Sequence, residues 1–485
     1  MTSILKQIHE DTKDGFVIEI DAEPQLLFLR CISFLSDADG IRLCTGCKGA
    51  SGMKCCFQCT NVLGGQRCHV AEHQHISSNQ VHLFKRQTPQ GLRDFLAHLS
   101  GLTVRSAKDK AETMLGWNTE ALRESFLLNP TLNSLISLPD VLYDPMHCYV
   151  SNGIVNQELG LWWLAVVTKS TVQLGEFQRY VLNTWTWNSD RGGFSSSLNM
   201  LLSPKLWQKH NDFRGDASDT LNALPLAVAF SIEVLRPVCP YLEKEIASLC
   251  ALHSVVLAWL HAKQNPQNAC RATWLKKQTV HIEKFVSCYG AETARPKLHF
   301  SLHLSEQLGR KGSIVDAFAT ERKHKRFKSD VGVKLKRLHD FAKVALLKCV
   351  EFDIHSKATC HTLDTELGGT GRQMPALAAA MKAKTALVAQ HLTSMAVKYG
   401  KGQFTILTPD VAVSIQAAAL IDGQPFLLCH ELKKTEQSHD GLSHWKQINN
   451  SVACVPLQQV VSSASAWYIR TVEEPHNKTV SLLLG

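Results

Sequence analysis

The sequence predicts a mixed α/β chain with a long helical middle and an all-β end, and three observations lead to this fold class. Residues 1–36 combine a short helical stretch (1–10) with strand-like apolar runs, of which 26–35 is the best candidate for a buried strand. Residues 90–295 have the apolar spacing of helices. Residues 400–485 alternate short apolar runs with turn signals, which favours a small β domain.

The helical middle should have a core of its own. Its periodicity is clearest at 91–99, 226–235 and 242–260, and eight of the ten tryptophans fall within it. Large aromatic rings bury much apolar area, so they favour a packed helical domain. The expected segments are 1–89, a mixed part rich in Cys and His; 90–295, the helical domain; 296–354, a basic helix; 355–399, a linker followed by a helix from 375; and 400–485, the β domain.

Composition sets limits on location and partners. The 485 residues are 45% hydrophobic, which suffices for two or three packed domains. The net charge of +9, from 52 basic and 43 acidic residues, permits nucleic-acid binding without establishing it. No uninterrupted apolar run approaches the roughly 18–20 residues of a membrane span, and Glu10 and Asp11 argue against a signal peptide. The 16 cysteines are then expected in the cytosol or nucleus, where clustered thiols indicate metal binding.

A cysteine cluster is the strongest local signal. Cys44-x-x-Cys47 and Cys56-x-x-Cys59 are separated by eight residues, and each pair can direct two thiolates at one ion. Tetrahedral zinc needs four such ligands, so a structural zinc site is expected, with its ligand set left open. The alternative is a buried thiol cluster without metal. Further candidate ligands nearby are Cys55, Cys68, His69, His73 and His75.

Two other motifs have metal-ligand spacing. Asp144 and His147 are three residues apart and can face one site from a single helical turn, where they could complete a zinc site begun by Cys56 and Cys59. The alternative for this pair is a helix N-cap or a surface feature. His299 and His303 are four apart on one helix face, a spacing that suits a metal or a phosphate and also ordinary packing.

A basic stretch surrounds one carboxylate, Glu321. Eight Lys or Arg side chains lie between residues 321 and 337, against two acids. The stretch is typical of a solvated helix face or a nuclear-import patch. It also suits a metal-binding acid flanked by phosphate contacts, because DNA requires cations nearby. The candidate DNA contacts here are Arg322, Lys323, His324, Lys325, Arg326 and Lys328.

Taken together, these motifs resemble the CACTA (En/Spm) family of cut-and-paste DNA transposases. Asp37 is followed by Lys48-Gly-Ala-Ser-Gly52 and Cys56-x-x-Cys59, as around the second catalytic aspartate of that family. Asp144-Pro-Met-His147 matches the family's Asp-x-x-His. Pro296-Lys-Leu-His299 with His303, and then Phe318-x-x-Glu321-Arg322, match the approach to the third acid. The resemblance covers about 26–330 in the family's order.

The resemblance implies an RNase H-like core, here partial, with a large helical insertion that 90–295 would fill. It implies Mg²⁺- or Mn²⁺-dependent DNA cleavage and strand transfer by two ions. Asp37 and Glu321 would be two of the three catalytic acids, and Lys48 would contact DNA. The protein would be nuclear, would bind DNA without a membrane, and could form a homo-oligomer.

The sequence departs from the family pattern in two places. Only 36 residues precede Asp37, so the first strands of the core and the first acid are expected to be missing and the chain inactive by itself. Asp21 is the one strand-borne replacement upstream, and Asp39 is an alternative to Asp37. Cys55 stands where the family has Pro, which adds a candidate ligand. The alternative function is a non-enzymatic zinc-containing module that binds DNA or protein.

Overall fold

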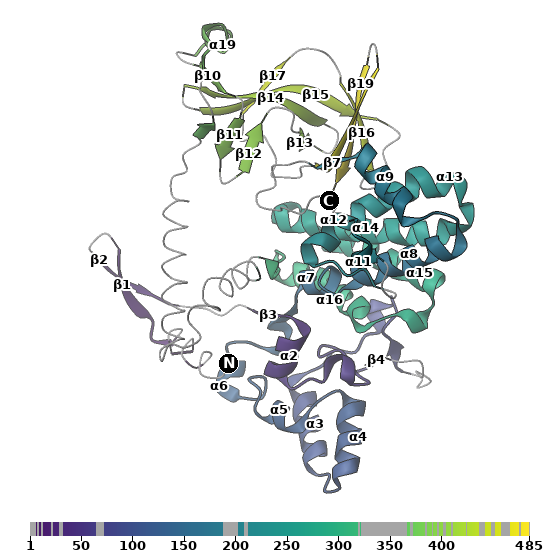
Figure 1. The fold of residues 1–485 in the computed structure, drawn as a ribbon. Helices are drawn as coiled ribbons and strands as arrows, with labels where there is room; N and C mark the ends of the chain where they lie inside the picture. Colours follow the sequence, from purple (N-terminus) through teal and green to yellow (C-terminus); the bar gives the residue numbers. More distant parts are fainter. Residues whose placement is uncertain are drawn as a thin grey trace, which may run out of the picture. The chain divides into compact units, whose positions relative to one another are not determined.

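The structure, a computed structural model (Figure 1), describes most of the chain. Its described residues are 6, 9–10, 13–20, 23–28, 33–64, 72–187, 202–207, 212–318, 321, 366–368, 372–383, 386–389, 391–394, 397–400, 404–408, 411–422, 424–435, 442–447, 452–456, 466–474 and 477–484. Within them the fold mixes helices and strands, helix predominates, and an antiparallel sheet lies near the C-terminus.

The chain forms two compact units. The first unit comprises Met1–Leu161 and Pro266–Ala317, and the second comprises Trp162–Asn265 and Phe318–Gly485. The boundary falls within helix α8 (Ile154–Lys169), so the stretch expected to be one helical domain is divided between the units.

The first unit contains most of the short elements. Its strands are β1 (Phe16–Ile20), β2 (Glu23–Leu27), β3 (Phe34–Ser36), β4 (Val62–Leu63), β5 (Gln74–His75) and β6 (Val141–Tyr143). Its α-helices, besides the start of α8, are α2 (Ala38–Thr45), α3 (Pro89–Ser100), α4 (Arg105–Leu115), α5 (Thr119–Arg123), α6 (Pro130–Asn133), α7 (Pro145–Tyr149), α15 (Arg271–Tyr289) and α16 (Pro296–Lys311). Its 3₁₀ turns are η1 (Gly49–Ser51), η2 (Val81–Leu83), η3 (Leu138–Asp140), η6 (Pro266–Asn268) and η7 (Ala291–Thr293).

A parallel pair of strands organises this unit. β3 and β6 pair from Phe34↔Val141 to Ser36↔Tyr143, and β6 is buried along its length. Each strand leads directly into a helix whose N-cap is an aspartate, because Asp37 accepts a hydrogen bond from the backbone of α2 and Asp144 from that of α7. The result is two strand-to-helix turns at the same edge of the strand pair.

A close backbone contact fixes the turn before the second cysteine pair. Lys48 N donates to Gly116 O (2.7 Å), and Met53 N donates to Thr113 O (2.8 Å). Gly116 has φ 79°, and a Cβ there would lie 1.9 Å from Lys54 O. Only glycine fits this approach, so the turn after Lys48 is held against the end of α4.

Helices α15 and α16 pack together through buried polar groups. Gln278 Nε2 donates to the hydroxyl of Tyr149 (3.0 Å) and to Ser301 O (2.6 Å). His281 Nε2 and Glu158 Oε2 lie 2.7 Å apart, with both side chains almost fully buried. Buried polar groups need such partners, so these contacts fix how α8 and α15 pack within the first unit.

The second unit begins with helices around an aromatic core. They are the end of α8, α9 (Leu174–Thr184), α11 (Pro204–Trp207), α12 (Ala217–Phe230), the π-helical turn η4 (Ser231–Leu235), α13 (Arg236–Val238), the 3₁₀ turn η5 (Pro240–Leu242) and α14 (Glu243–Gln264). The ring of Phe177 lies 5.2 Å from that of Trp207 and 4.9 Å from that of Phe230, and Trp207 lies 4.7 Å from Phe213. All four are buried, as the aromatic content of this stretch led us to expect.

Two helices here are long and apolar enough to cross a membrane. They span Ala217–Val238 and Pro240–Lys263, which is longer than the apolar runs recognised in the sequence. In each, 61% of the apolar window is buried by the protein itself. Core helices of soluble proteins have the same length and composition, so these two are weak support for a membrane span.

The C-terminal part of the second unit is a ten-stranded antiparallel sheet with a separate three-stranded one. The larger sheet has the order β7-β18-β19-β16-β15-β14-β10-β9, with β13 on β14 and β17 on β15, and the smaller has the order β12-β11-β8. The strands are β7 (Thr186–Trp187), β8 (Glu366–Gly368), β9 (Arg372–Gln373), β10 (Ala386–Ala389), β11 (His391–Ser394), β12 (Val397–Gly400), β13 (Phe404–Thr408), β14 (Val411–Ile421), β15 (Gln424–Lys434), β16 (Leu442–Gln447), β17 (Ala453–Pro456), β18 (Ala466–Glu474) and β19 (Asn477–Leu484).

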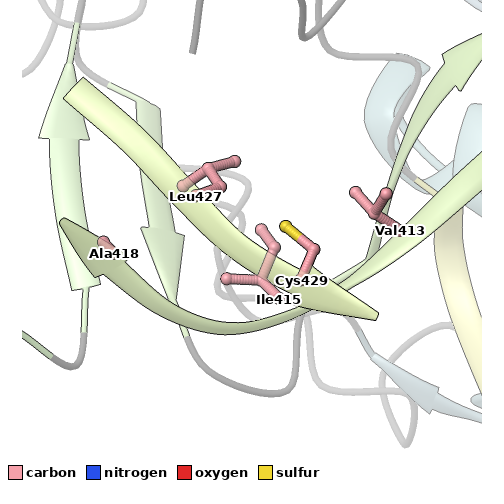
Figure 2. Close-up of a cluster of buried hydrophobic side chains, with 5 residues drawn as sticks. All are labelled: Val413, Ile415, Ala418, Leu427 and Cys429. Carbon is pink, nitrogen blue, oxygen red and sulfur yellow. The ribbon is translucent and has the colours of Figure 1, made fainter. Parts of the chain in front are cut away.

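The two longest strands of the sheet, β14 and β15, carry a buried cluster on one face. Val413, Ile415, Ala418, Leu427 and Cys429 pack together there (Figure 2). The pairing of the strands shifts by one residue after Ile415, which keeps Ala418 on the same face as Val413 despite the odd spacing. The bulge therefore preserves one continuous apolar face.

Two expectations about local structure were wrong. The helix expected at 375–399 is only α19 (Pro375–Ala380); Lys382 then takes a positive φ of 54°, and β10 to β12 follow. Its alanine-rich start has helix propensity, but strand pairing decides the rest. The run expected as one buried strand at 26–35 is also not buried throughout, since Leu26 and Phe28 are exposed. Residues 29–32 lie outside the described residues, and β3 pairs with β6.

Candidate metal centre

Two short motifs that are far apart in the sequence meet inside the first unit. Cys56 and Cys59 lie in the loop that follows η1, and His299 and His303 lie one turn apart on α16. All four side chains are buried, and their ligand atoms lie within 4.8 Å of one another. This Cys₂His₂ cluster could hold a metal ion such as zinc.

Three distances within the Cys₂His₂ cluster can be compared with those around a tetrahedral zinc ion. His303 Nε2 lies 3.3 Å from Cys56 Sγ, 3.5 Å from Cys59 Sγ and 3.2 Å from His299 Nε2. Zinc bonds of about 2.3 Å to sulfur and about 2.05 Å to nitrogen give tetrahedral N···S edges of about 3.5 Å and N···N edges of about 3.3 Å. The three distances from His303 Nε2 are therefore close to the edges of a tetrahedral site, and all four ligand atoms lie within 4.8 Å of one another.

Aromatic rings enclose the two histidines. Tyr143 of β6 stacks on Phe300, with ring centroids 4.4 Å apart, and on His303 at 5.6 Å. Phe84 meets His299 edge-on at 4.8 Å. Packing of this kind limits the rotamers of both imidazoles and keeps water out, so the ligands are held in place before any ion binds.

Hydrogen bonds fasten the cluster to strand β6. Tyr143 donates its hydroxyl hydrogen to Cys56 Sγ (3.3 Å), and Gln58, inside the Cys-x-x-Cys motif, donates to Val141 O (2.9 Å). The side-chain amide of Gln307 on α16 can be oriented so that both its oxygen and its nitrogen have partners. In that orientation the oxygen accepts from Tyr143 N (2.8 Å) and the nitrogen donates to Tyr143 O (3.1 Å). Strand β6 is thus hydrogen-bonded to β3 and to Gln307 of helix α16.

The charges inside the cluster favour one thiolate even without metal. Burial acts to raise the pKa of Cys56, but its hydrogen bond with Cys59 and the two imidazoles outweigh burial and hold that pKa well below its ordinary value. The pKa of Cys59 is raised, chiefly by the same hydrogen bond, so Cys59 keeps the proton. Burial lowers the pKa of His299, whereas for His303 the Cys56 thiolate outweighs burial and raises the pKa.

Asp144 and His147 do not complete this site, contrary to our prediction. The Asp144 carboxylate accepts hydrogen bonds from the backbone N–H groups of Met146 and His147 (both 3.2 Å) and of Ala317 (3.0 Å), and it also bonds His147 Nδ1. Its oxygens are therefore engaged in capping α7 and in holding the chain at Ala317. The N-cap alternative is the one that the structure bears out.

The other predicted thiol ligands lie outside the cluster. Cys44 is half-buried in α2, and Cys47 is buried and pairs through its backbone with Trp117. Cys55 is buried beside Cys56, and burial raises the pKa values of both Cys47 and Cys55. Cys44 and Cys47 are not among the four side chains that meet.

The predicted catalytic and DNA-contacting residues lie partly within the described chain. Asp37 directly follows β3, as expected, and accepts a hydrogen bond from Gly40 N (2.6 Å) as the N-cap of α2. Lys48 Nζ lies 3.4 Å from Glu112 Oε2, so its charge is paired within the first unit. Glu321 is an exposed helical residue of the second unit. The basic residues Arg322, Lys323, His324, Lys325, Arg326 and Lys328, and the candidates Asp21, Cys68 and His69, lie outside the described residues.

Each half of the cluster is visible in the sequence, but their union is not. Cys-x-x-Cys and His-x-x-x-His each supply two ligands, and together they make the four that a tetrahedral zinc site needs. Asp144 and His147 offered an equally good second half, and only the packing of α16 against β6 decides between the two. Comparison with protein-family models, with curated proteins and with solved structures found no match.

Proposed function

We propose that the chain is a transposase-derived, DNA-binding protein related to the CACTA type, in which the Cys₂His₂ cluster holds a structural zinc ion. One observation carries the proposal. The cluster is built from two of the motif strings that convey the family resemblance, whose members Cys56 and His303 are 247 positions apart. Independent folding of unrelated motifs would not be expected to bring two such strings into tetrahedral spacing.

The donor set favours a structural role for the ion. Two thiolates and two imidazoles fill all four tetrahedral positions, and a closed zinc site has no position for substrate or water. Two thiolates also balance the charge of Zn²⁺, which suits the buried location. The ion would join the loop after η1 to α16, and structural zinc sites of this kind supply about 10–16 kcal/mol of apparent binding energy to folding.

We propose the DNA binding that the resemblance implies, and not DNA cleavage by the chain alone. Within the described residues, the Cys₂His₂ cluster is the one group of three or more Cys, His, Asp or Glu side chains spaced to hold a metal ion, and Asp37 belongs to no such group. The resemblance favours nuclear DNA binding, and the expectation that the chain by itself does not cleave DNA stays a prediction. The basic stretch after Glu321 would supply phosphate contacts.

The test is a Mg²⁺- or Mn²⁺-dependent nicking assay with a gel-shift assay on the same purified protein. DNA retained without cleavage supports the proposal. Cleavage that Glu321→Gln abolishes would establish an active transposase-like site and overturn the expectation of inactivity. If DNA is not retained at low salt, DNA binding is wrong, and the zinc-containing protein-binding module becomes the better account.

A further inference from the structure

Two charged residues lie against His303 of the Cys₂His₂ cluster, at Nδ1 and not at Nε2, the ring nitrogen that faces the two thiols. Arg86 Nη1 lies 2.8 Å from His303 Nδ1 and 3.6 Å from Cys59 Sγ, and its Nη2 donates to Glu306 Oε2 at 2.6 Å. Glu306 Oε2 in turn lies 3.5 Å from His303 Nδ1. Arg86 is placed here by its backbone pairing with Cys59, and Glu306 by following His303 by three residues on α16.

The contact between Arg86 and His303 specifies where the ring proton is. A guanidinium group only donates hydrogen bonds, so the 2.8 Å contact requires a lone pair on His303 Nδ1. The proton of the neutral ring must then be on Nε2, the atom that faces the two thiols.

A metal ion at Nε2 reverses this arrangement. The ion needs the lone pair of Nε2, so the ring proton must move to Nδ1, and Arg86 cannot accept a hydrogen bond from it. Glu306 can. Metal-bound histidines usually donate their second N–H to a carboxylate or carbonyl, which fixes the ring and strengthens the ligand.

We propose that Glu306 and Arg86 form the outer shell of the metal site. Metal binding then changes the hydrogen-bond partner of His303 Nδ1 from Arg86 to Glu306. The inference rests on the proposed zinc site. In the loaded site Glu306 orients His303, while Arg86 remains paired with Glu306 and donates to the Cys59 thiolate. Because the charges of Arg86 and Glu306 cancel, they leave unchanged the charge balance between the two thiolates and Zn²⁺.

The other histidine ligand is held differently. Among the described residues, His299 Nδ1 is buried and has no hydrogen-bond partner, and its ring is held by the edge-on contact with Phe84. His303 is therefore the ligand whose orientation depends on charged neighbours. Substitutions at Glu306 should act on the metal through His303.

The experiment measures the zinc affinity of the full chain by competition with a chromophoric chelator, for the wild type, Glu306→Gln and Glu306→Ala. The matched control is Glu120→Ala, which removes an exposed carboxylate paired with Arg123 and Lys108 elsewhere in the first unit. We expect Glu306→Ala to weaken zinc binding about 10- to 100-fold. Glu306→Gln, which keeps an acceptor oxygen, should fall between it and the wild type.

A cobalt-loaded sample gives the readout that a merely structural role would not move. Arg86→Ala should shift the sulfur-to-cobalt charge-transfer band, because Cys59 loses its N–H donor. Equal zinc affinity of Glu306→Ala and Glu120→Ala, in a wild type that binds one zinc, would overturn this inference and leave the zinc site standing. A wild type that binds no zinc would overturn the site itself. Circular dichroism identifies a variant that has not folded, and Glu306→Gln then decides.

Discussion

Asp37 and Asp144 directly follow two parallel strands whose last paired residues are Ser36 and Tyr143. The two carboxylates therefore leave the strand pair at the same edge, each as the N-cap of the next helix. Asp144 has a second task, because it accepts the backbone N–H of Ala317, 173 positions away. Asp144 thus links this edge to the chain at Ala317.

Replacing Asp144 should loosen this edge without removing the metal. Asp144→Asn loses the charge that three backbone N–H groups and His147 Nδ1 share. Because these capping hydrogen bonds are buried and charge-assisted, we expect the free energy of unfolding to fall by about 2–4 kcal/mol. Hydrogen exchange should show faster exchange at Met146, His147 and Ala317. Asp216→Asn, at the exposed N-cap of α12, is the matched control. Unchanged exchange at Ala317 would contradict the tether.

The ligand set can be tested one residue at a time. Substitution of Cys56 or Cys59 by Ser, or of His299 or His303 by Ala, should reduce the bound zinc to a small fraction of one ion per chain, because a four-ligand structural site tolerates the loss of a ligand poorly. Cys47→Ser should retain the zinc. Mass spectrometry under native conditions measures both. Zinc lost from Cys47→Ser but kept by His299→Ala would contradict the Cys₂His₂ set and favour Cys47 as a ligand.

The buried pair of Glu158 and His281 should be costly to break. Each side chain is the partner of the other in an interior that excludes water. His281→Leu removes this buried partner of the Glu158 carboxylate, and we expect the free energy of unfolding of the first unit to fall by about 3–5 kcal/mol. The double variant Glu158→Leu/His281→Leu should recover most of it. A denaturant series on the wild type, Glu158→Leu, His281→Leu and the double variant measures the coupling, and additive losses would show that the pair is not coupled.

Cys148 should make the first unit sensitive to alkaline pH. Burial raises the pKa of Cys148 from 9.0 to about 12. Between these values the unfolded thiol releases its proton and the folded thiol keeps it, so stability falls as pH rises, by about 1.4 kcal/mol per pH unit. Below pH 9 the effect vanishes. Thermal unfolding from pH 8 to 11 measures the slope. Cys148→Ala should lessen it, and Cys270→Ala, at an exposed position, should not.

The sequence could predict those parts of the site that depend on local spacing. Cys-x-x-Cys and His-x-x-x-His are each set by a few neighbouring residues, and each was recognised. The Asp-Pro start of α7 is also local, and N-capping was among the alternatives considered. Pairing Cys56 with His303 was beyond such reasoning, because it depends on how α16 packs on β6 across 247 positions.

The errors in secondary structure have the same origin. The helix expected from 375 onward begins with alanines, whose propensity is real, yet Ala386–Ala389 pairs with β14 and joins the sheet. The sheet also recruits Thr186–Trp187 from the helical part of the chain. Strand pairing between such distant segments overrides local preference. A short segment of the sequence does not contain both partners, so its pattern cannot predict the pairing.

The most direct test of the central claim is the X-ray absorption spectrum at the zinc edge of the purified full chain. The Cys₂His₂ cluster predicts one zinc with two sulfur neighbours at about 2.3 Å and two nitrogen neighbours at about 2.0 Å. His303→Ala should lower the nitrogen count or release the ion. A chain that binds no zinc, or a shell of four sulfurs drawn from Cys44, Cys47, Cys56 and Cys59, would contradict the account.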